Sequence, residues 1–125
     1  MGTDEIRTKR ALVVEDEPAI GRTCKRVLTA EGFQVDVAEN GLIALEMVHL
    51  KDYDLCLSDV RIPVMDGMEF YAHLKAENSN LTQRIVFMSG DIVGGRTGEF
   101  IKESRRPVLA KPFDPDQLRQ IARAF

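Results

Sequence analysis

A chain of 125 residues, of which 44% are hydrophobic and 30% charged, has the size and composition of one globular domain. Its formal net charge of −3 argues against nucleic acid or an anionic membrane surface as a direct partner. The first ten residues are polar and charged, and no later stretch is as long and apolar as a membrane-spanning helix, so we expect a cytoplasmic location.

Apolar runs that suit buried strands alternate with helical patterns along the chain. This alternation is typical of a parallel α/β sheet that is covered by helices on both faces. We expect one domain over residues 10–125, preceded by a flexible arm or linker at residues 1–9. The expected strands are residues 11–14, 33–38, 55–57, 85–88 and 108–110.

Turn and capping residues predict where the helices between these strands begin and end. Gly32 is expected to end the first helix, and the second is expected to run to about Leu50. The fourth helix is expected over residues 97–103, behind a glycine-rich segment at 94–98. The other four helices begin with a capping residue or a first-turn proline: Pro18, Asn40, Asp66 and Asp114-Pro115.

The cysteines and histidines do not suggest a functional site. Cys24 falls inside an expected helix and Cys56 inside an expected strand. We expect both to be small buried side chains of a protein in a reducing compartment. The sequence has no pair or cluster with the spacing of a zinc site. His49 and His73 lie on expected helices, and we predict that they are surface residues with no catalytic or metal-binding role.

Polar residues come directly after four expected strands, and they predict a site. Because the carboxyl ends of parallel strands line one crevice, Glu15-Asp16, Asp59, Ser89 and Lys111 should converge there. Three carboxylates that close require a cation, and oxygen ligands suit Mg²⁺ or Mn²⁺. Lys111 would bind an anionic group such as phosphate. The pattern therefore predicts a metal-assisted phosphoryl acceptor with Asp59 as the nucleophile.

Four segments, VVEDEP, SDVRIPVMDG, FMSG and AKPF, resemble in order and spacing the signature segments of the response regulator receiver domain of two-component signalling. The resemblance covers about residues 10–125 and implies a flavodoxin-like, doubly wound sheet of strand order 2-1-3-4-5. It implies that the phosphoryl donor is the phosphohistidine of a sensor histidine kinase or of a histidine phosphotransfer protein, and it allows a homodimer.

The same resemblance limits the expected activity. It implies self-phosphotransfer and autodephosphorylation, with histidine kinase activity only if the chain is part of a larger hybrid kinase. The segment at residues 90–113 is similar to receivers attached to such hybrid sensor kinases.

Carried over to this sequence, the resemblance assigns four residues to a metal site. Asp16 matches the main metal carboxylate, and Glu15 matches the acidic neighbour that usually acts through water. Asp59 is both phosphoacceptor and metal ligand. Arg61 matches the position whose backbone carbonyl binds the metal, and we expect its side chain to lean over the mouth of the site and prolong the phosphorylated state.

The resemblance also assigns the residues that meet the phosphoryl group. Ser89 matches the Thr/Ser switch position, whose hydroxyl would donate to a phosphoryl oxygen, and Lys111 matches the lysine that pairs with the group. A cis peptide bond between Lys111 and Pro112 is implied, which would aim the lysine back into the crevice.

Two positions depart from the family pattern. Glu15 stands where an aspartate is common, and its longer side chain would shift the water network around the metal. Val108 stands where a tyrosine or phenylalanine usually rotates inward, and a valine side chain is too short and stiff for that movement. We therefore expect a phosphorylation signal to travel mainly through the glycine-rich stretch at residues 90–98.

Three other functions compete with this one. A nucleotide-binding sheet needs glycines and free backbone N–H groups where this chain has Glu15-Asp16-Glu17, which argues against a dinucleotide or flavin site. A phosphatase-like hydrolase with an aspartyl nucleophile would carry a DxD spacing after its first strand, and Glu15-Asp16-Glu17 followed by Pro18 does not fit. The main alternative is a receiver-like interaction module that binds partners without phosphorylation.

Overall fold

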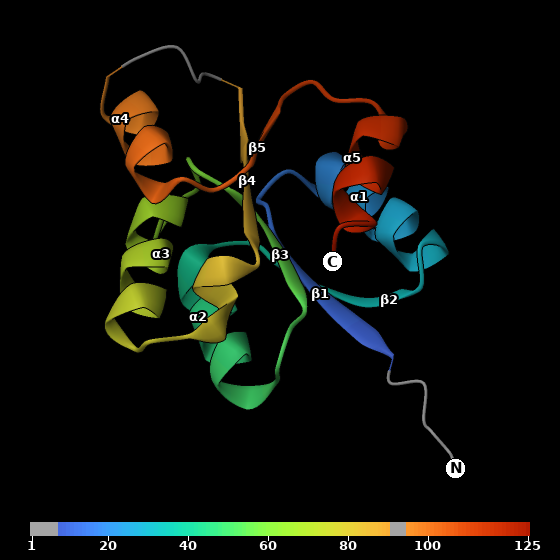
Figure 1. The fold of residues 1–125 in the computed structure, drawn as a ribbon, viewed down its shortest axis with the longest axis horizontal. Coiled ribbons are helices and arrows are strands. Elements are labelled where there is room, and N and C mark those ends of the chain that lie inside the picture. The colour runs from blue at the N-terminus through green and yellow to red at the C-terminus, as the bar shows by residue number, and fades with distance from the viewer. Residues whose placement is uncertain (1–7, 91–94) are drawn as a thin grey trace.

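The computed structural model describes residues 8–90 and 95–125. They form three layers, in which a central sheet lies between two layers of helices (Figure 1). A five-stranded parallel sheet of order β2-β1-β3-β4-β5 is the central layer, which confirms the predicted flavodoxin-like topology. The strands are β1 (Lys9–Val14), β2 (Phe33–Ala38), β3 (Leu55–Asp59), β4 (Ile85–Ser89) and β5 (Val108–Ala110). The helices are α1 (Pro18–Ala30), α2 (Gly41–Leu50), α3 (Gly67–Ala76), α4 (Gly95–Ser104) and α5 (Pro115–Ala122), with a short 3₁₀ helix η1 (Asn80–Gln83).

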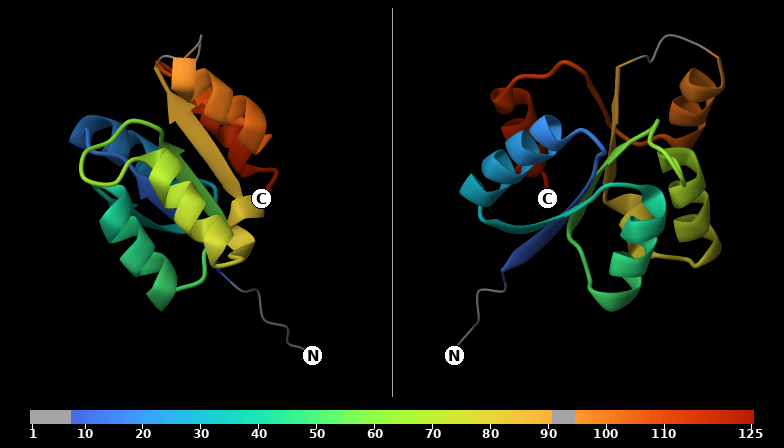
Figure 2. Two further views of the ribbon diagram at one scale, coloured as in Figure 1. Left: turned by 90° about the vertical axis from the view of Figure 1, so that its left-hand side faces the viewer. Right: turned by 180° about the vertical axis from the view of Figure 1, so that it is seen from behind.

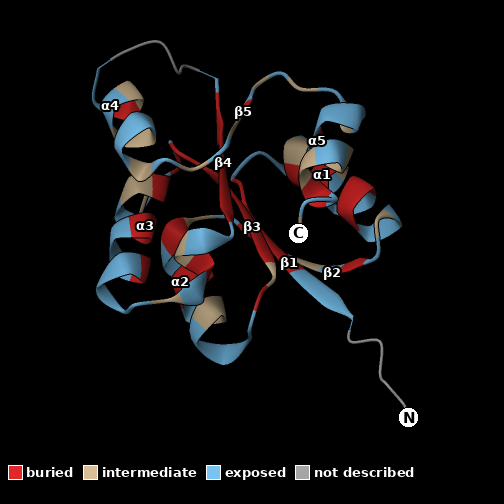
Figure 3. Ribbon diagram, viewed as in Figure 1, coloured by how far each residue is buried: buried red, intermediate tan, exposed pale blue. Residues whose placement is uncertain are grey.

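Helices cover both faces of the sheet, as the apolar strands predicted. Helices α1 and α5 lie on one face, and α2, α3 and α4 lie on the other (Figures 1 and 2). Side chains alternate between the faces along each strand, so Ala11 and Val13 pack towards α1 and α5 while Leu12 and Val14 pack towards the other three helices. The inner strands are therefore buried on both sides, whereas the helices are exposed on their outer surfaces (Figure 3).

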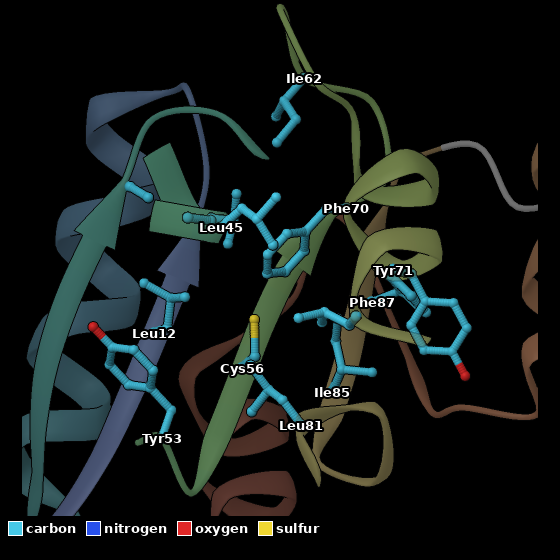
Figure 4. Close-up of a cluster of buried hydrophobic side chains, with 14 of the residues drawn as sticks. Leu12, Leu45, Tyr53, Cys56, Ile62, Phe70, Tyr71, Leu81, Ile85 and Phe87 are labelled. Atoms are coloured by element: carbon cyan, nitrogen blue, oxygen red, sulfur yellow. The ribbon is translucent and has the colours of Figure 1, made fainter. Parts of the chain in front are cut away.

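The larger of the two cores lies under α2, α3 and α4, where Phe70, Tyr71 and Phe87 pack against aliphatic side chains of the sheet (Figure 4). The smaller core joins the sheet to α1 and α5 through residues such as Leu28 and Leu118. Cys24 and Cys56 are buried free thiols, as predicted. Burial, the main cause, raises the pKa of Cys24 to about 12, so this thiol stays protonated and unreactive at neutral pH.

Most predicted helix ends are confirmed by local hydrogen bonds. The Asn40 side chain accepts a 2.9 Å hydrogen bond from the Ile43 amide at the start of α2. Asp66 and Asp114 each form a capping box, at the starts of α3 and α5. Gly32, just beyond α1, has a φ of 97°, a left-handed conformation that favours glycine.

Four details differ from the sequence-based expectations. Strand β1 begins at Lys9, inside the expected arm, because Lys9 pairs with Phe33 at the start of β2. Strands β3 and β4 extend to Asp59 and Ser89, which end their strands and do not follow them. Helix α4 is longer than expected at both ends, and η1 was not expected. Residues 1–7 of the expected arm lie outside the described residues.

None of the helices within residues 8–90 and 95–125 is long and apolar enough to cross a membrane.

Gly67 fixes the distance between the end of β3 and the start of α3. A Cβ atom added there would lie 2.3 Å from the Asp59 carbonyl oxygen, which belongs to the backbone and cannot rotate away. We expect Gly67→Ala to lower the free energy of unfolding by about 1.5 kcal/mol because the helix must move off the strand.

Chemical unfolding followed by circular dichroism measures this change. Gly21→Ala is the matched control, since the nearest atom to its added Cβ is a Val37 side-chain carbon at 3.4 Å, an ordinary van der Waals contact. Gly21 is the fourth residue of α1, where that change should be neutral or stabilising by up to about 1 kcal/mol. Equal effects of the two substitutions would contradict the argument.

Candidate active site

Three strands bring Glu15, Asp59 and Lys111 into direct contact at the carboxyl edge of the sheet. The last register pair of β1 and β3 joins Val14 to Ser58, so Glu15 and Asp59 follow side by side. The Lys111 Nζ atom donates hydrogen bonds to Glu15 Oε1 at 2.7 Å and to Asp59 Oδ2 at 2.6 Å. Because β4 separates β3 from β5, only a long side chain can make this contact. The sequence therefore predicted this convergence correctly.

The peptide bond between Lys111 and Pro112 is cis, as the resemblance implied.

This charge cluster is largely withdrawn from water. The Glu15 side chain has no exposed surface, and those of Asp59 and Lys111 are 10% and 14% exposed. Burial raises the pKa of Glu15 above its ordinary value. Burial alone would lower the pKa of Lys111, but its hydrogen bonds to Asp59 and Glu15 outweigh that effect and raise it. The ammonium group therefore remains charged at neutral pH and compensates the carboxylates around it.

Asp16 completes an acidic cluster that fits a hard cation. Oxygen atoms of Glu15, Asp16 and Asp59 all lie within 4.8 Å of one another. Glu15 and Asp59 are buried, whereas Asp16 is exposed, so one side of the cluster faces water. A set of carboxylate oxygens with access to water suits Mg²⁺, which keeps several of its own water ligands. The donor set therefore fits the metal that the sequence predicted.

Ser89 ends β4 between the two strands that carry Asp59 and Lys111. Its carbonyl oxygen accepts a 2.9 Å hydrogen bond from the Lys111 amide, and the residue is buried. As the last residue of β4, Ser89 lies at the carboxyl edge of the sheet, as predicted. The donation of its hydroxyl to a phosphoryl oxygen stays a prediction.

Arg61 contacts the site through its backbone and helix α4 through its side chain. Its amide donates to Asp59 Oδ1 at 3.2 Å, while its Nε and Nη2 atoms donate to Thr97 Oγ1 at 3.4 Å each. The amide contact places Arg61 beside the acceptor, and the metal-binding role of its backbone carbonyl stays a prediction. Its link to Thr97 was not predicted, because no local pattern relates two residues 36 positions apart.

The aromatic side chains near Val108 come from other elements. Val108 is partly buried and pairs in register with Phe87 of β4. The rings of Phe87, Phe100 and Tyr71 meet edge to face, with centroids 5.0 to 5.7 Å apart. Aromatic packing here thus involves β4, α3 and α4, and strand β5 contributes an aliphatic residue. The predicted signal path over residues 90–98 falls partly outside the described residues, since 91–94 are not described.

His49 and His73 are exposed, as predicted. His49 Nε2 lies 3.0 Å from both carboxylate oxygens of Glu77, and this contact joins α2 to the end of α3, away from the strand ends that carry the acidic cluster.

The fold and the site together define a class of protein: a doubly wound α/β domain with an acidic cluster and a lysine at the carboxyl edge of its sheet. The model of the response regulator receiver domain family matches residues 11–123. The chain belongs to that family, as its four signature segments indicated.

Similar proteins agree with this assignment. The chain is 32% identical over 121 residues to sporulation initiation phosphotransferase F of Bacillus subtilis, covering 94% of this chain and 93% of that one. It is 34% identical over 116 residues to the transcriptional regulatory protein TcrA of Mycobacterium tuberculosis, covering 93% of this chain but 45% of TcrA. The chain thus spans nearly all of one relative and less than half of the other.

Solved structures show the same fold. The receiver domain of the sensor histidine kinase PA1611 from Pseudomonas aeruginosa superposes with a TM-score of 0.81 at 26% sequence identity, covering 94% of this chain and 97% of that one. In that structure a magnesium ion is coordinated in the active-site cleft.

Proposed function

We propose that this domain accepts a phosphoryl group from a phosphohistidine onto Asp59, with Mg²⁺ or Mn²⁺, and that the phosphorylated and free forms act as a conformational switch. The observation that carries the proposal is the contact of Lys111 Nζ with Asp59 Oδ2 at 2.6 Å inside an acidic cluster. An ammonium group next to a carboxylate nucleophile can neutralise the charge of an incoming phosphoryl group.

The residues divide the chemistry between them. An Asp59 carboxylate oxygen would attack phosphorus and form the O–P bond as the P–N bond of the phosphohistidine breaks and the imidazole leaves. Lys111 would pair with one phosphoryl oxygen, and the Ser89 hydroxyl would donate to another.

A metal would be held by Glu15, Asp16, Asp59 and the backbone carbonyl of Arg61. When bound, it would supply positive charge to the carboxylates and to the phosphoryl oxygens. Hydrolysis by water would later release phosphate and regenerate Asp59.

The proposed partner is a sensor histidine kinase or a histidine phosphotransfer protein, in the cytoplasm as the sequence indicated. Support comes from the similarity to a sporulation phosphotransferase and from a 40% identity over 70 residues to the sensor protein EvgS of Escherichia coli, although that match covers 56% of this chain and 6% of EvgS. A homodimer is compatible with this proposal.

The test is labelling with a small phosphodonor such as phosphoramidate in the presence of Mg²⁺. Intact-mass analysis should show one added phosphoryl group that is stable in acid and lost in alkali, as an acyl phosphate is. Asp59→Asn should remain unlabelled, and Asp54→Asn is the control because Asp54 precedes β3 at the opposite end of that strand. Equal labelling of Asp59→Asn and the parent would contradict the assignment, and no labelling of the parent would favour the interaction module.

A further inference from the structure

One arginine connects the phosphoacceptor to helix α4. The Arg61 amide nitrogen lies 3.2 Å from Asp59 Oδ1, and the Nε atom of its guanidinium lies 3.4 Å from Thr97 Oγ1. Arg61 belongs to the loop between β3 and α3, and Thr97 belongs to α4, so the side chain bridges two separate elements. The bridge therefore begins at a residue whose own amide contacts the phosphoacceptor carboxylate.

Thr97 is placed to hold the guanidinium. It is 2% exposed, which makes it the buried residue of α4 within the part of that helix that is described. Its single hydroxyl oxygen accepts from both Nε and Nη2, so it contacts the guanidinium at two of its donor atoms. Both bonds are long, and each is therefore weaker than an ordinary charged hydrogen bond.

Arg61 itself is exposed, and among the described residues the contact with Thr97 is the hydrogen bond that fixes the far end of this long side chain. The hollow that Arg61 and Thr97 line also includes Arg96, Met68 and Pro63, and it is open to solvent. The loss of the Thr97 hydroxyl would therefore release the guanidinium into water.

We propose that Thr97 is a positioning residue that holds the Arg61 guanidinium on the rim of the site, where it restricts the approach of water to phosphorylated Asp59 and so lengthens the life of the acyl phosphate. This inference rests on the proposed phosphorylation of Asp59. It assigns the rate of self-dephosphorylation to a contact between the β3–α3 loop and α4 that the sequence did not indicate.

Two substitutions of Thr97 separate positioning from packing. Thr97→Val keeps the shape and removes the hydroxyl, whereas Thr97→Ser keeps the hydroxyl and removes a buried methyl group. If Thr97 only packs, Thr97→Ser should be the more disruptive change because it leaves a cavity. If Thr97 positions Arg61, Thr97→Val should be the one that alters the phosphoryl lifetime.

The experiment measures the half-life of the phosphoryl group by intact mass after the donor is removed, with Mg²⁺ present. We expect Arg61→Ala to shorten the half-life about fivefold and Thr97→Val about threefold, since a released side chain still covers the site part of the time. Thr97→Ser should keep the parent half-life. Thr97→Val should have no further effect in the Arg61→Ala background, because its effect acts through Arg61.

Each other result overturns the inference. A parent half-life or a longer one in Thr97→Val, an equal shortening by Thr97→Ser, or an undiminished effect of Thr97→Val without Arg61 would each show that Thr97 does not act by holding the guanidinium. These outcomes leave phosphorylation itself in place. A parent protein that takes no label at all would instead overturn both the inference and the proposed function.

Discussion

Replacing Lys111 by methionine is expected to lower the free energy of unfolding by about 3 kcal/mol at neutral pH without Mg²⁺, since the change breaks a buried ion pair by removing one partner. The Glu15 side chain, which has no exposed surface, would lose the ammonium that lies 2.7 Å from it. Methionine has a similar length, so packing changes little. The chain contains no tryptophan, and urea unfolding is best followed by far-ultraviolet circular dichroism.

The unpaired charge of Glu15 causes much of this loss, and a second substitution checks it. In the Lys111→Met background, Glu15→Gln should recover much of the lost stability because it removes the unpaired charge. A double variant no more stable than Lys111→Met would contradict the explanation.

The pH dependence of the same loss has a definite sign. The pKa of Lys111 is raised above 10.5 in the folded state, so its contribution is complete below pH 10.5 and disappears as the pH rises through the folded-state value. The pKa of Glu15 is raised above 4.5, so the folded state takes up a proton more readily than the unfolded chain. Lys111→Met should therefore regain stability as the pH falls, and a loss that grows on acidification would be the wrong sign.

Mg²⁺ should raise the free energy of unfolding by about 2.7 kcal/mol when its free concentration is about a hundredfold above its dissociation constant. The physical reason is that Glu15, Asp16 and Asp59 place oxygen atoms within 4.8 Å of one another, and a divalent cation relieves their repulsion. Thermal or urea unfolding at neutral pH, with and without the ion, measures the shift.

Asp16→Ala should abolish this stabilisation, because Asp16 is the exposed carboxylate through which the cluster faces water. Asp52→Ala is the matched control: Asp52 is an exposed aspartate that precedes β3, at the opposite end of the sheet, and its removal should leave the shift intact. Identical unfolding curves of the parent protein with and without Mg²⁺ would remove the metal from the account.

Much of the fold could be predicted because its signals are local. The side chains of Asp66 and Asp114 mark helix starts because each accepts a hydrogen bond from the amide three residues further on. Each apolar run likewise indicates a buried strand from its own residues. The convergence of Glu15, Asp59 and Lys111 could also be predicted, since parallel strands deliver their carboxyl ends to one edge whatever the packing of the helices.

The remaining features depend on tertiary contacts that carry no local pattern. Lys9 reads as part of a polar arm, and only its pairing with Phe33 makes it a strand residue. Thr97 reads as a helix residue after glycines, and its contact with Arg61 depends on where α4 packs against the β3–α3 loop. Val108 could be identified as a departure from the aromatic residue usual in the family. Its sequence position did not show that Phe100 of α4 would pack against Phe87.

Chemical mapping can identify the residue that receives the phosphoryl group, which we propose is Asp59. The protein is treated with phosphoramidate and Mg²⁺, reduced with borohydride, which converts an aspartyl phosphate into homoserine, and then digested for peptide mass spectrometry. We expect homoserine at position 59 and unmodified residues at Glu15 and Asp16. A reduced residue at another carboxylate, or an unaltered Asp59 in labelled protein, would contradict it.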